Sequence, residues 1–396
     1  MNRDDFEILN NNIIYFDNSA TTFKPKDVIN GELDYYNNYC SNIHRGDYDI
    51  AMKAEEEYDE ARMVLKDFIG ANRSSEIVFT HGATDSLNMI VFGFMKYYLN
   101  EGDEVILSKS EHASNILPWM VLEKEIGIKI KYVPLDDKFG VTLDNLEKTI
   151  TPKTKVISLA HITNVMGDVR NIDAIGKLCD SKNILFVVDA AQSLGHKKVD
   201  VSNISFLVAS SHKMLGPTGV GLLYGKYELL NKMVPISLGG GMNATFSSDG
   251  VIELKDLPER LESGTPNIAG VIGFKKAIQY IKRIGLDNIY KHEVELKKYF
   301  LDKIKNVEEI EVYNEDTPTG IIAFNIKNVF AQDTAVYLNH YNICIRAGNH
   351  CAKILKDELK INNTCRISFY LYNTKEEVDK LVEVLSNTKD LFKVVI

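Results

Sequence analysis

Short apolar runs alternate with helix-like segments through the middle of this chain, and this alternation constrains the fold more than any other feature. The runs that predict strands are 76–79, 104–108, 128–134, 155–160, 184–190 and 204–210. They are almost continuously apolar, as strands of a parallel sheet are when crossover helices bury them on both faces. We therefore expect an α/β fold with a large, mainly parallel sheet.

The C-terminal part of the chain has a different pattern. A long stretch with helical spacing at 268–306 leads into strand-like runs at 321–326, 341–347 and 365–373, and an amphipathic helix is predicted over 375–388. Strands mixed with helices in this way predict a smaller α+β domain packed on the first. We expect residues 20–260 to form the large domain and residues 1–19 and 261–396 to form the small one.

Composition and charge exclude several classes of protein. The 396 residues include 46 Lys and Arg against 55 Asp and Glu, so the net charge is −9, with no basic excess to bind a nucleic acid backbone. The five cysteines lack the spacing of disulfide frameworks or zinc sites, so we expect reduced thiols and no metal. The N-terminus has no signal-peptide core, and the longest apolar run is too short to cross a membrane. These features predict a cytoplasmic protein that binds neither membranes nor nucleic acids.

Four clusters of side chains could carry chemistry, and three of them directly follow strand-like runs, where open α/β sheets bind their ligands. The clusters are HGATDS (81–86) with Thr84, VVDAAQ (187–192) with Asp189 and Gln192, SSHK (210–213) with Ser210, His212 and Lys213, and IRAGNHCA (345–352) with Cys351, which Arg366 follows after fifteen residues. Each has an ordinary interpretation by itself: a capped turn, a buried ion pair, a solvated lysine and a buried structural cysteine.

The combination of these clusters favours one kind of site. A Gly-containing turn that opens a helix, as before Thr84, presents N–H groups to a phosphate. A lysine in a desolvated site is a nucleophilic amine, and an acid at a neighbouring strand end can hold a pyridine nitrogen protonated. A pyridoxal 5′-phosphate site requires these groups, with Lys213 as the Schiff-base lysine and Asp189 as the acid.

Specific motifs along nearly the whole chain resemble those of a known family. The motifs are FDNSATTFKP (16–25), HRG (44–46), EHASNILPW (111–119), HITNVMGDVR (161–170), DAAQ (189–192), SHKMLGPTGVG (211–221), ESGTPN (262–267) and RAGNHCA (346–352). This set is similar to that of the cysteine desulfurases of the class V aminotransferase group, which have the fold type I architecture of pyridoxal phosphate enzymes. The short RAGNHCA loop, with Arg366 fifteen residues after Cys351, resembles the group II, Suf-type branch.

The resemblance implies a role for each residue of the cofactor site. Lys213 would form the Schiff base and act as the base at the substrate Cα, and His112 would stack on the pyridine ring and take part in proton transfer. Asp189 would pair with the ring nitrogen, and Gln192 with the phenolic oxygen. The phosphate contacts are implied for Thr84, Ser210 and His212, with Ala83 beside them, and for Thr265 of the neighbouring subunit. The family therefore predicts a homodimer.

The resemblance also implies how the substrate is bound and where its sulfur goes. Asn164 and Arg366 would bind the carboxylate of L-cysteine, and Arg346 would line the site near Cys351. Cys351 would take the sulfur as a persulfide and leave L-alanine, and a nearby cation, His112 or an arginine, would favour its thiolate. The expected partner is a small Suf-type sulfur-acceptor protein, and the expected role is the supply of sulfur to iron–sulfur cluster assembly.

Three positions depart from the family pattern. Ser211 stands where SGHK-type relatives have Gly, Ala83 where many have a second Thr, and Asn349 where many have His. None of these changes removes a core catalytic group. The change at Ala83 affects the expected phosphate contacts, and the change at Asn349 leaves His350 as the only imidazole next to Cys351 in the sequence.

Other functions remain open on the sequence. A selenocysteine lyase of the same fold would depend less on Cys351, because selenide leaves readily. A non-catalytic scaffold with this fold would be expected to have lost part of its Lys, Asp and His set, yet Lys213, Asp189 and His112 are all present. An aminotransferase or an epimerase has no use for Cys351. A dehydrogenase is disfavoured because no GxGxxG motif follows a strand-like run.

Overall fold

The computed structural model describes residues 2–44 and 46–387, so the central arginine of the HRG motif lies outside the described residues. The strands are β1 Ile14–Tyr15, β2 Ile77–Thr80, β3 Glu104–Ser108, β4 Lys129–Val133, β5 Thr154–Ala160, β6 Leu185–Asp189, β7 Phe206–Ser210, β8 Gly221–Gly225, β9 Asn243–Phe246, β10 Ile252–Leu254, β11 Ile310–Val312, β12 Ile321–Ile326, β13 Ile343–Cys344, β14 Arg346–Gly348 and β15 Thr364–Ser368.

The α-helices are α1 Lys26–Asn38, α2 Asp49–Ile69, α3 Ala83–Asn88, α4 Lys96–Tyr98, α5 Leu117–Ile126, α6 Leu143–Thr149, α7 Ile172–Ser181, α8 Tyr227–Leu230, α9 Ile268–Ile284, α10 Leu286–Ile304, α11 Ala331–Asn339, α12 Lys353–Leu359 and α13 Lys375–Ser386. A π-helical segment, Met89–Met95, joins α3 to α4. Short 3-10 turns lie at Arg3–Asp5, Glu7–Asn11, Ser74–Glu76, Ala113–Asn115, Ser211–Lys213 and Glu259–Leu261.

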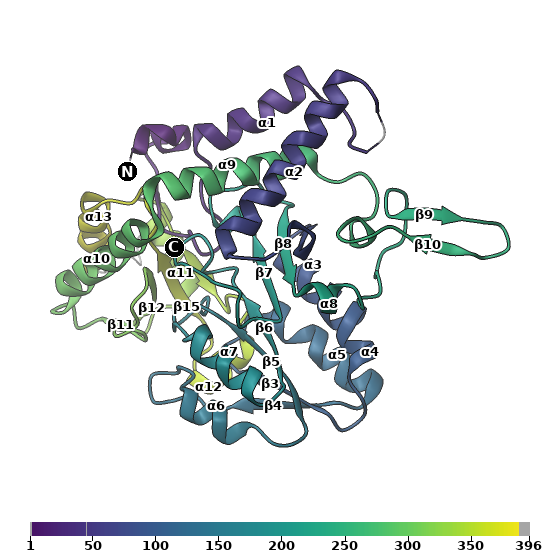
Figure 1. Cartoon of the computed structure of the whole chain (residues 1–396). Coiled ribbons are helices and arrows are strands. Elements are labelled where there is room, and N and C mark those ends of the chain that lie inside the picture. Colours follow the sequence, from purple (N-terminus) through teal and green to yellow (C-terminus); the bar gives the residue numbers. More distant parts are fainter. Residues whose placement is uncertain (1, 45, 388–396) are drawn as a thin grey trace.

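A seven-stranded sheet forms the centre of the larger part of the molecule (Figure 1). Its strand order is β2-β8-β7-β6-β5-β3-β4, and the strands from β7 to β4 run parallel to one another. Strand β8 is antiparallel to both of its neighbours. The expected large, mainly parallel sheet is therefore confirmed. The sequence pattern does not predict β8, because its short apolar run continues a glycine-rich turn.

Helices cover both faces of this sheet. In β6, Phe186 and Val188 pack in a core shared with α1, α2, α7 and α9, whereas Val187 between them packs with α5 and the helical segment 83–98. Successive side chains of a strand point to opposite faces, so burial on both faces requires a continuous apolar run. This explains the strand signal in the sequence.

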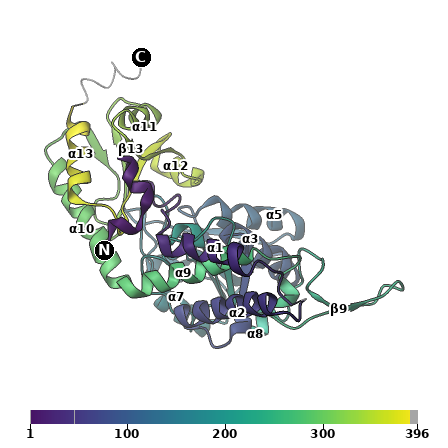
Figure 2. The same cartoon turned by 90° about the horizontal axis from the view of Figure 1, so that it is seen from above.

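The smaller part of the molecule contains a four-stranded antiparallel sheet with the order β11-β12-β15-β14. Side chains of α10, α11 and α13 pack against it in a separate core. Strand β1 pairs in parallel with β13, so the N-terminal segment lies beside this smaller part, as Figure 2 shows. Residues 1–19 are expected in the same part from the sequence.

The expected continuous helix over 268–306 is wrong at one point. Gly285, with a φ of 89°, separates α9 from α10. Helix α9 packs in the core of the larger sheet beside α1 and α2, whereas α10 packs in the core of the smaller one. We therefore propose that the second domain boundary lies at Gly285 rather than at residue 261.

Two further features lie outside these layers. The hairpin of β9 and β10 projects from the larger part of the molecule (Figures 1 and 2). None of the described helices combines the length and the apolar character that crossing a membrane requires.

Candidate active site

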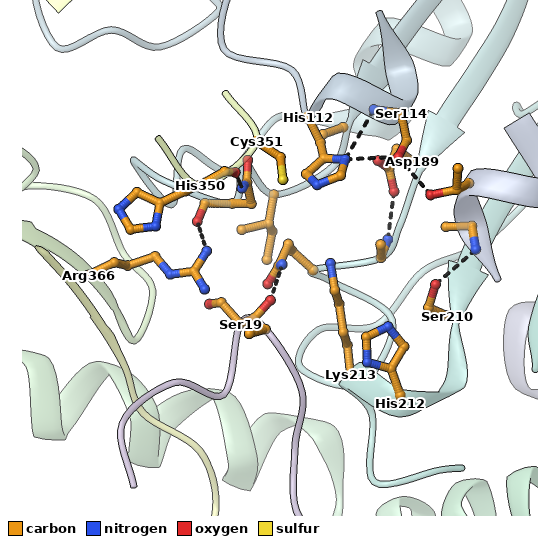
Figure 3. A pocket seen from close by; sticks show the side chains of 18 of the residues that line it. Ser19, His112, Ser114, Asp189, Ser210, His212, Lys213, His350, Cys351 and Arg366 are labelled. Carbon is orange, nitrogen blue, oxygen red and sulfur yellow. Dashed lines mark hydrogen bonds between the residues drawn. The ribbon is translucent and has the colours of Figure 1, made fainter. Parts of the chain in front are cut away.

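A cavity of about 230 Å³ brings most of the expected site residues together (Figure 3). The expected residues that line it are Lys213, Asp189, Gln192, His112, Thr84, Ala83, Ser210, His212, Asn164, Arg346, Arg366 and Cys351. Lining residues to which the sequence analysis gives no role are Ser19, Ala20, Ser114, Ala160, Ile162, Ala191 and His350. The FDNSATT motif contains Ser19 and Ala20, so a signal for these two was present in the sequence.

The sheet topology explains why residues far apart in sequence meet here. Asp189 is the last residue of β6, Lys213 ends the turn that follows β7, and His112 follows β3. These strands are parallel, so their carboxyl ends lie at one edge of the sheet. Strand β2, which precedes Thr84, runs in the same direction because β8 is antiparallel to both β2 and β7.

The surroundings of Lys213 make its side-chain amine easier to deprotonate than that of a solvated lysine. Burial lowers the pKa of Lys213 to about 8, and the positive charges of Arg366 and Arg346 act in the same direction, against the opposing effect of Asp189. At pH 7 about a tenth of the lysine is therefore the free amine, a far larger share than for a solvated lysine. Lys213 is thus a nucleophile and a base near neutral pH.

Asp189 and Gln192 are fixed beside this amine. Asp189 Oδ1 accepts a hydrogen bond from Ala191 N at 2.9 Å, and Gln192 Nε2 donates to Ser19 O at 2.8 Å. Burial raises the pKa of Asp189, whereas the Ala191 hydrogen bond and the charge of Lys213 lower it. A cationic group placed against this carboxylate would favour its ionised form.

His112 is neutral in this structure. Burial lowers the pKa of His112 to about 4, and the charges of Lys213, Arg346 and Arg366 add to the effect. Its Nδ1 accepts a hydrogen bond from Ser114 N at 3.1 Å, so the proton of the neutral ring is on Nε2. This low pKa disfavours a cationic His112 beside the cysteine, so of the two expected cations the arginines of the opposite wall remain.

At the end of the cavity where the cofactor phosphate is expected, the polar groups hydrogen-bond to one another. Ala83 N donates to Ser210 Oγ at 2.8 Å, and the hydroxyls of Thr84 and Ser114 lie 2.7 Å apart. The backbone of Gly221 approaches Gly82 so closely that a Cβ on Gly221 would lie 2.4 Å from the Gly82 Cα. The departure at Ala83 thus leaves a backbone donor and its serine partner in place.

The opposite wall of the cavity comes from the smaller sheet. Arg346 and Arg366 are directly opposite each other on β14 and β15, which explains why both reach the cavity. Arg366 Nη1 donates to Asn164 O, and Arg366 Nη2 pairs with Asp17 Oδ1, both at 2.9 Å. Burial lowers the pKa of Arg366, and Asp17 opposes this effect.

The cysteine loop, residues 349–352, lies between this wall and two segments that follow strands of the larger sheet, and it hydrogen-bonds to both segments. The side chain of Cys351 reaches both the cavity and the exterior, since the residue is exposed and also lines the cavity. His350 and Cys351 have φ values of 52° and 56°, a left-handed conformation that residues other than glycine rarely adopt. Ala113 N donates to Cys351 O at 2.8 Å, and Asn164 Nδ2 donates to His350 O at 2.7 Å.

His350 is a structural residue of this loop. Its Nε2 lies 2.9 Å from Thr364 O, which only accepts, so Nε2 carries the proton. Burial lowers the pKa of His350 to about 2, with further contributions from Arg366 and Lys356. The other ring nitrogen, Nδ1, is buried and has no hydrogen-bond partner among the described residues.

Thr265 is the one expected site residue that the cavity does not include. It is exposed, and its Oγ1 accepts a hydrogen bond from Asn42 Nδ2 at 3.4 Å. A contact from Thr265 to the site of a neighbouring subunit remains a prediction.

The residues of the cavity fit pyridoxal 5′-phosphate. A buried amine with a lowered pKa and a buried carboxylate line the same space, as the aldehyde and the ring nitrogen of this cofactor require. Asn164 Oδ1 is buried and has no hydrogen-bond partner among the described residues. The cations of Lys213, Arg346 and Arg366 suit an anionic cofactor and an anionic substrate.

Residues 14–381 match the model of the class-V aminotransferase family. The chain belongs to this family. A relative from Halalkalibacterium halodurans, named a probable cysteine desulfurase, is 40% identical over 390 residues, which cover 98% of this chain and 96% of the relative. A probable cysteine desulfurase of Staphylococcus aureus is 39% identical over 397 residues, with coverages of 98% and 96%.

Two solved structures are similar to the whole class-V aminotransferase fold of this chain. The apo cysteine desulfurase of Thermococcus onnurineus NA1 gives a TM-score of 0.93 at 37% identity and covers 97% of this chain and 96% of its own. The cysteine desulfurase CsdA of Escherichia coli gives 0.92 at 32% identity, with coverages of 100% and 98%. The expected fold class and family are therefore confirmed.

Proposed function

We propose that this protein is a cysteine desulfurase that converts L-cysteine to L-alanine and takes the sulfur on Cys351. The observation that carries the proposal is that Lys213 and Cys351, from different sheets, line one cavity. In the overall reaction the C–S bond of the substrate breaks and an S–S bond to Cys351 forms. Free cysteine and the Cys351 thiol become alanine and the Cys351 persulfide, so atoms and electrons balance without an added oxidant.

Pyridoxal 5′-phosphate is the cofactor of this enzyme. When bound, it supplies an aldehyde for the substrate amine and a ring that withdraws electrons from the substrate Cα. We assign Lys213 to hold the aldehyde, Asp189 to hold the ring N–H, Gln192 to hold the phenolic oxygen and His112 to cover the ring face, on the support of their positions around the cavity. The residues assigned to the phosphate are Thr84, Ser210 and His212, with Ala83 beside them.

The remaining residues bind the substrate and move its proton. Lys213, with its pKa lowered to about 8, takes the proton from Cα. Arg366 of the opposite wall and the amide of Asn164, whose backbone carbonyl accepts a hydrogen bond from Arg366, are assigned to the substrate carboxylate. Arg346 lines the same wall near Cys351. Cys351 attacks the substrate sulfur as a thiolate, the nucleophilic form of a cysteine.

We also propose that the enzyme is a homodimer. Thr265 is exposed and is assigned to the phosphate of the partner subunit. The hairpin of β9 and β10 carries large exposed apolar side chains, with Phe246 at 71% and Ile252 at 63% of their full exposure. Exposed apolar surface of this kind is typical of subunit contacts.

A small Suf-type protein is proposed as the acceptor of the sulfur for iron–sulfur cluster assembly. Because Cys351 is exposed as well as lining the cavity, a persulfide on it can be reached from outside. The persulfide requires a thiol that stays reduced, which favours a cytoplasmic location.

The function is tested by incubating the purified protein, loaded with the cofactor, with L-cysteine and a reductant. We expect alanine and sulfide in equal amounts and, before reductant is added, one extra sulfur atom on the peptide that contains Cys351 by mass spectrometry. No alanine would overturn the proposed activity. Alanine without sulfur on Cys351 would overturn the role of this cysteine, and faster turnover of selenocysteine without need of Cys351 would indicate a selenocysteine lyase.

A further inference from the structure

Two segments of the larger domain hold the cysteine loop. The His112 arm, residues 111–115, donates from Ala113 N to Cys351 O at 2.8 Å. The Asn164 arm, residues 161–170, donates from Asn164 Nδ2 to His350 O at 2.7 Å. The two bonds go to consecutive carbonyls of one loop, so the position of Cys351 depends on how the two arms lie relative to each other.

A buried ion pair joins the two arms at their bases. Glu111 begins the His112 arm, Arg170 ends the Asn164 arm, and both side chains have 0% exposure. The carboxylate of Glu111 accepts hydrogen bonds from the guanidinium of Arg170, from Asn115 Nδ2 at 2.8 Å and from Ala160 N at 2.8 Å. Because all three partners are N–H donors, the hydrogen bonding fits an ionised carboxylate. Burial raises the pKa of Glu111, and Arg170 opposes this effect.

The guanidinium of Arg170 extends the connection to both sides. Its Nη2 donates to Ser110 Oγ at 2.8 Å, next to the His112 arm, and its Nη1 donates to Ala160 O at 3.0 Å, at the end of β5. The backbone N–H of Arg170 donates to His161 O at 2.9 Å and so closes the Asn164 arm. Hydrogen bonds to several acceptors in these fixed directions require the planar group of N–H donors that arginine has and lysine lacks.

We propose that Glu111 and Arg170 are positioning residues that set the place of Cys351 by fixing the two arms that hold its loop. Neither side chain lines the cavity, so the pair reaches Cys351 through the arms, while the charge of Arg170 also lowers the pKa of Asp189. This inference rests on the proposed role of Cys351 as the sulfur acceptor. A sulfur transfer between two sulfur atoms requires close and aligned approach, so a small displacement of the loop has a large effect on its rate.

The test uses Glu111→Gln and Arg170→Lys in the enzyme loaded with the cofactor. In a single turnover with L-cysteine, persulfide formation on Cys351 should slow about tenfold in Glu111→Gln and about threefold in Arg170→Lys, because the arms lose their alignment. The absorbance change of the cofactor on addition of L-cysteine should slow by a clearly smaller factor, because His112 and Asn164 reach the cavity directly from the arms, whereas Cys351 is held only through its loop.

A second measurement needs neither cofactor nor substrate. Iodoacetamide should alkylate Cys351 at a rate that differs about threefold from the wild-type rate in both variants, because loosened arms move this exposed thiol relative to the charged groups of the cavity. Cys40 is also exposed and gives the reference rate within the same sample. Peptide mass spectrometry reports the ratio of the two rates.

Lys275→Met is the matched control. The side chain of Lys275 is 1% exposed, and its amine pairs with Glu60 at 2.6 Å and with Glu57, which tie α9 to α2 away from the cavity. The control variant should lose thermal stability without changing persulfide formation or the alkylation ratio.

The outcomes separate the inference from the proposed function. If Glu111→Gln slows persulfide formation and the absorbance change by the same factor, or leaves the alkylation ratio at the wild-type value, the pair is merely structural and the inference is refuted. If Glu111→Gln does not fold, Arg170→Lys decides, since it keeps a charge opposite Glu111. If the wild-type protein forms no persulfide, the proposed function fails, whereas the alkylation ratio still tests whether the pair holds the loop.

Discussion

The two walls of the cavity are built differently. Lys213, Asp189 and His112 lie at the ends of parallel strands, or just after them, inside a sheet covered on both faces. Cys351 lies in a loop of the smaller domain, in a left-handed conformation, with an exposed side chain. The first wall can therefore bury the amine of Lys213 and lower its pKa, whereas the loop of the second wall can present sulfur to both the cavity and the exterior.

The charges of the two walls differ for the same reason. Burial lowers the pKa of Lys213 to about 8 and that of His112 to about 4, so the first wall offers neutral or partly neutral bases. The second wall carries Arg346 and Arg366 as cations on neighbouring strands. Bases near neutral pH suit proton transfer, and fixed cations suit a thiolate and a carboxylate.

The largest expected effect comes from removing the Lys213 amine from the first wall. Lys213→Ala should lower turnover of L-cysteine about 10⁴-fold or more, because the amine that holds the cofactor and moves the proton is lost. Turnover is measured as alanine formed per enzyme. The protein should also lose its stable yellow colour, and retained turnover would remove Lys213 from its assigned role.

Removing the Cys351 thiol from the second wall should have a smaller and more selective effect. Cys351→Ala should keep the colour and the cofactor but lower sulfide release from L-cysteine about 100-fold, because only the sulfur acceptor is missing. Cys40→Ala, which removes the other exposed cysteine, is the control and should behave like the wild type. Full activity of Cys351→Ala on L-cysteine would contradict the proposed difference between the walls.

The pH dependence of cofactor binding tests whether the first wall lowers the pKa of Lys213. Binding needs the unprotonated Lys213 amine, whose share rises about tenfold from pH 6 to pH 7 and levels off above its pKa of about 8. The rate at which the cofactor-free protein regains its colour should follow this curve. Asp189→Asn should move the midpoint to lower pH, because Asp189 raises the pKa of Lys213. A rate that keeps rising to pH 10 would indicate a solvated lysine.

The smallest expected effect concerns the support behind the cysteine loop. Thr364 Oγ1 accepts a hydrogen bond from the buried amine of Lys356 and lies 3.0 Å from His350 Nε2. Thr364→Val should lower the free energy of unfolding by about 1–2 kcal/mol, since the buried ammonium loses this acceptor. Thr364→Ser keeps the hydroxyl and is the matched control in urea unfolding. Equal stability of the two variants would show that the hydroxyl does not support the loop.

Much of the site could be predicted because its chemistry depends on residue type at strand ends. The buried run before Asp189 and the SHK motif at Lys213 both have a local signature, and the structure places both residues at the cavity. Residues that act through other residues have no such signature. Glu111 and Arg170 are 59 positions apart, and only the pairing of β5 with its neighbours brings them together.

The fold likewise contains elements with a local sequence signal and elements without one. Continuous apolar runs predicted the parallel strands, because burial on both faces requires them. Strand β8 and the break at Gly285 were missed, because the first is short and glycine-flanked and the second interrupts an otherwise helical pattern. In both cases the local pattern is weak, and packing against distant segments decides the structure.

The sequence by itself determined the family, the cofactor chemistry and most residues of the cavity, since these follow from which side chains stand in which motif. The tertiary structure alone decided their pKa values and their connections: that burial lowers the pKa of His112 to about 4, that His350 hydrogen-bonds to Thr364, and that Arg346 and Arg366 face each other. The physical reason is that pKa values and hydrogen-bond partners depend on burial and on neighbours distant in sequence, and only the packed chain provides both.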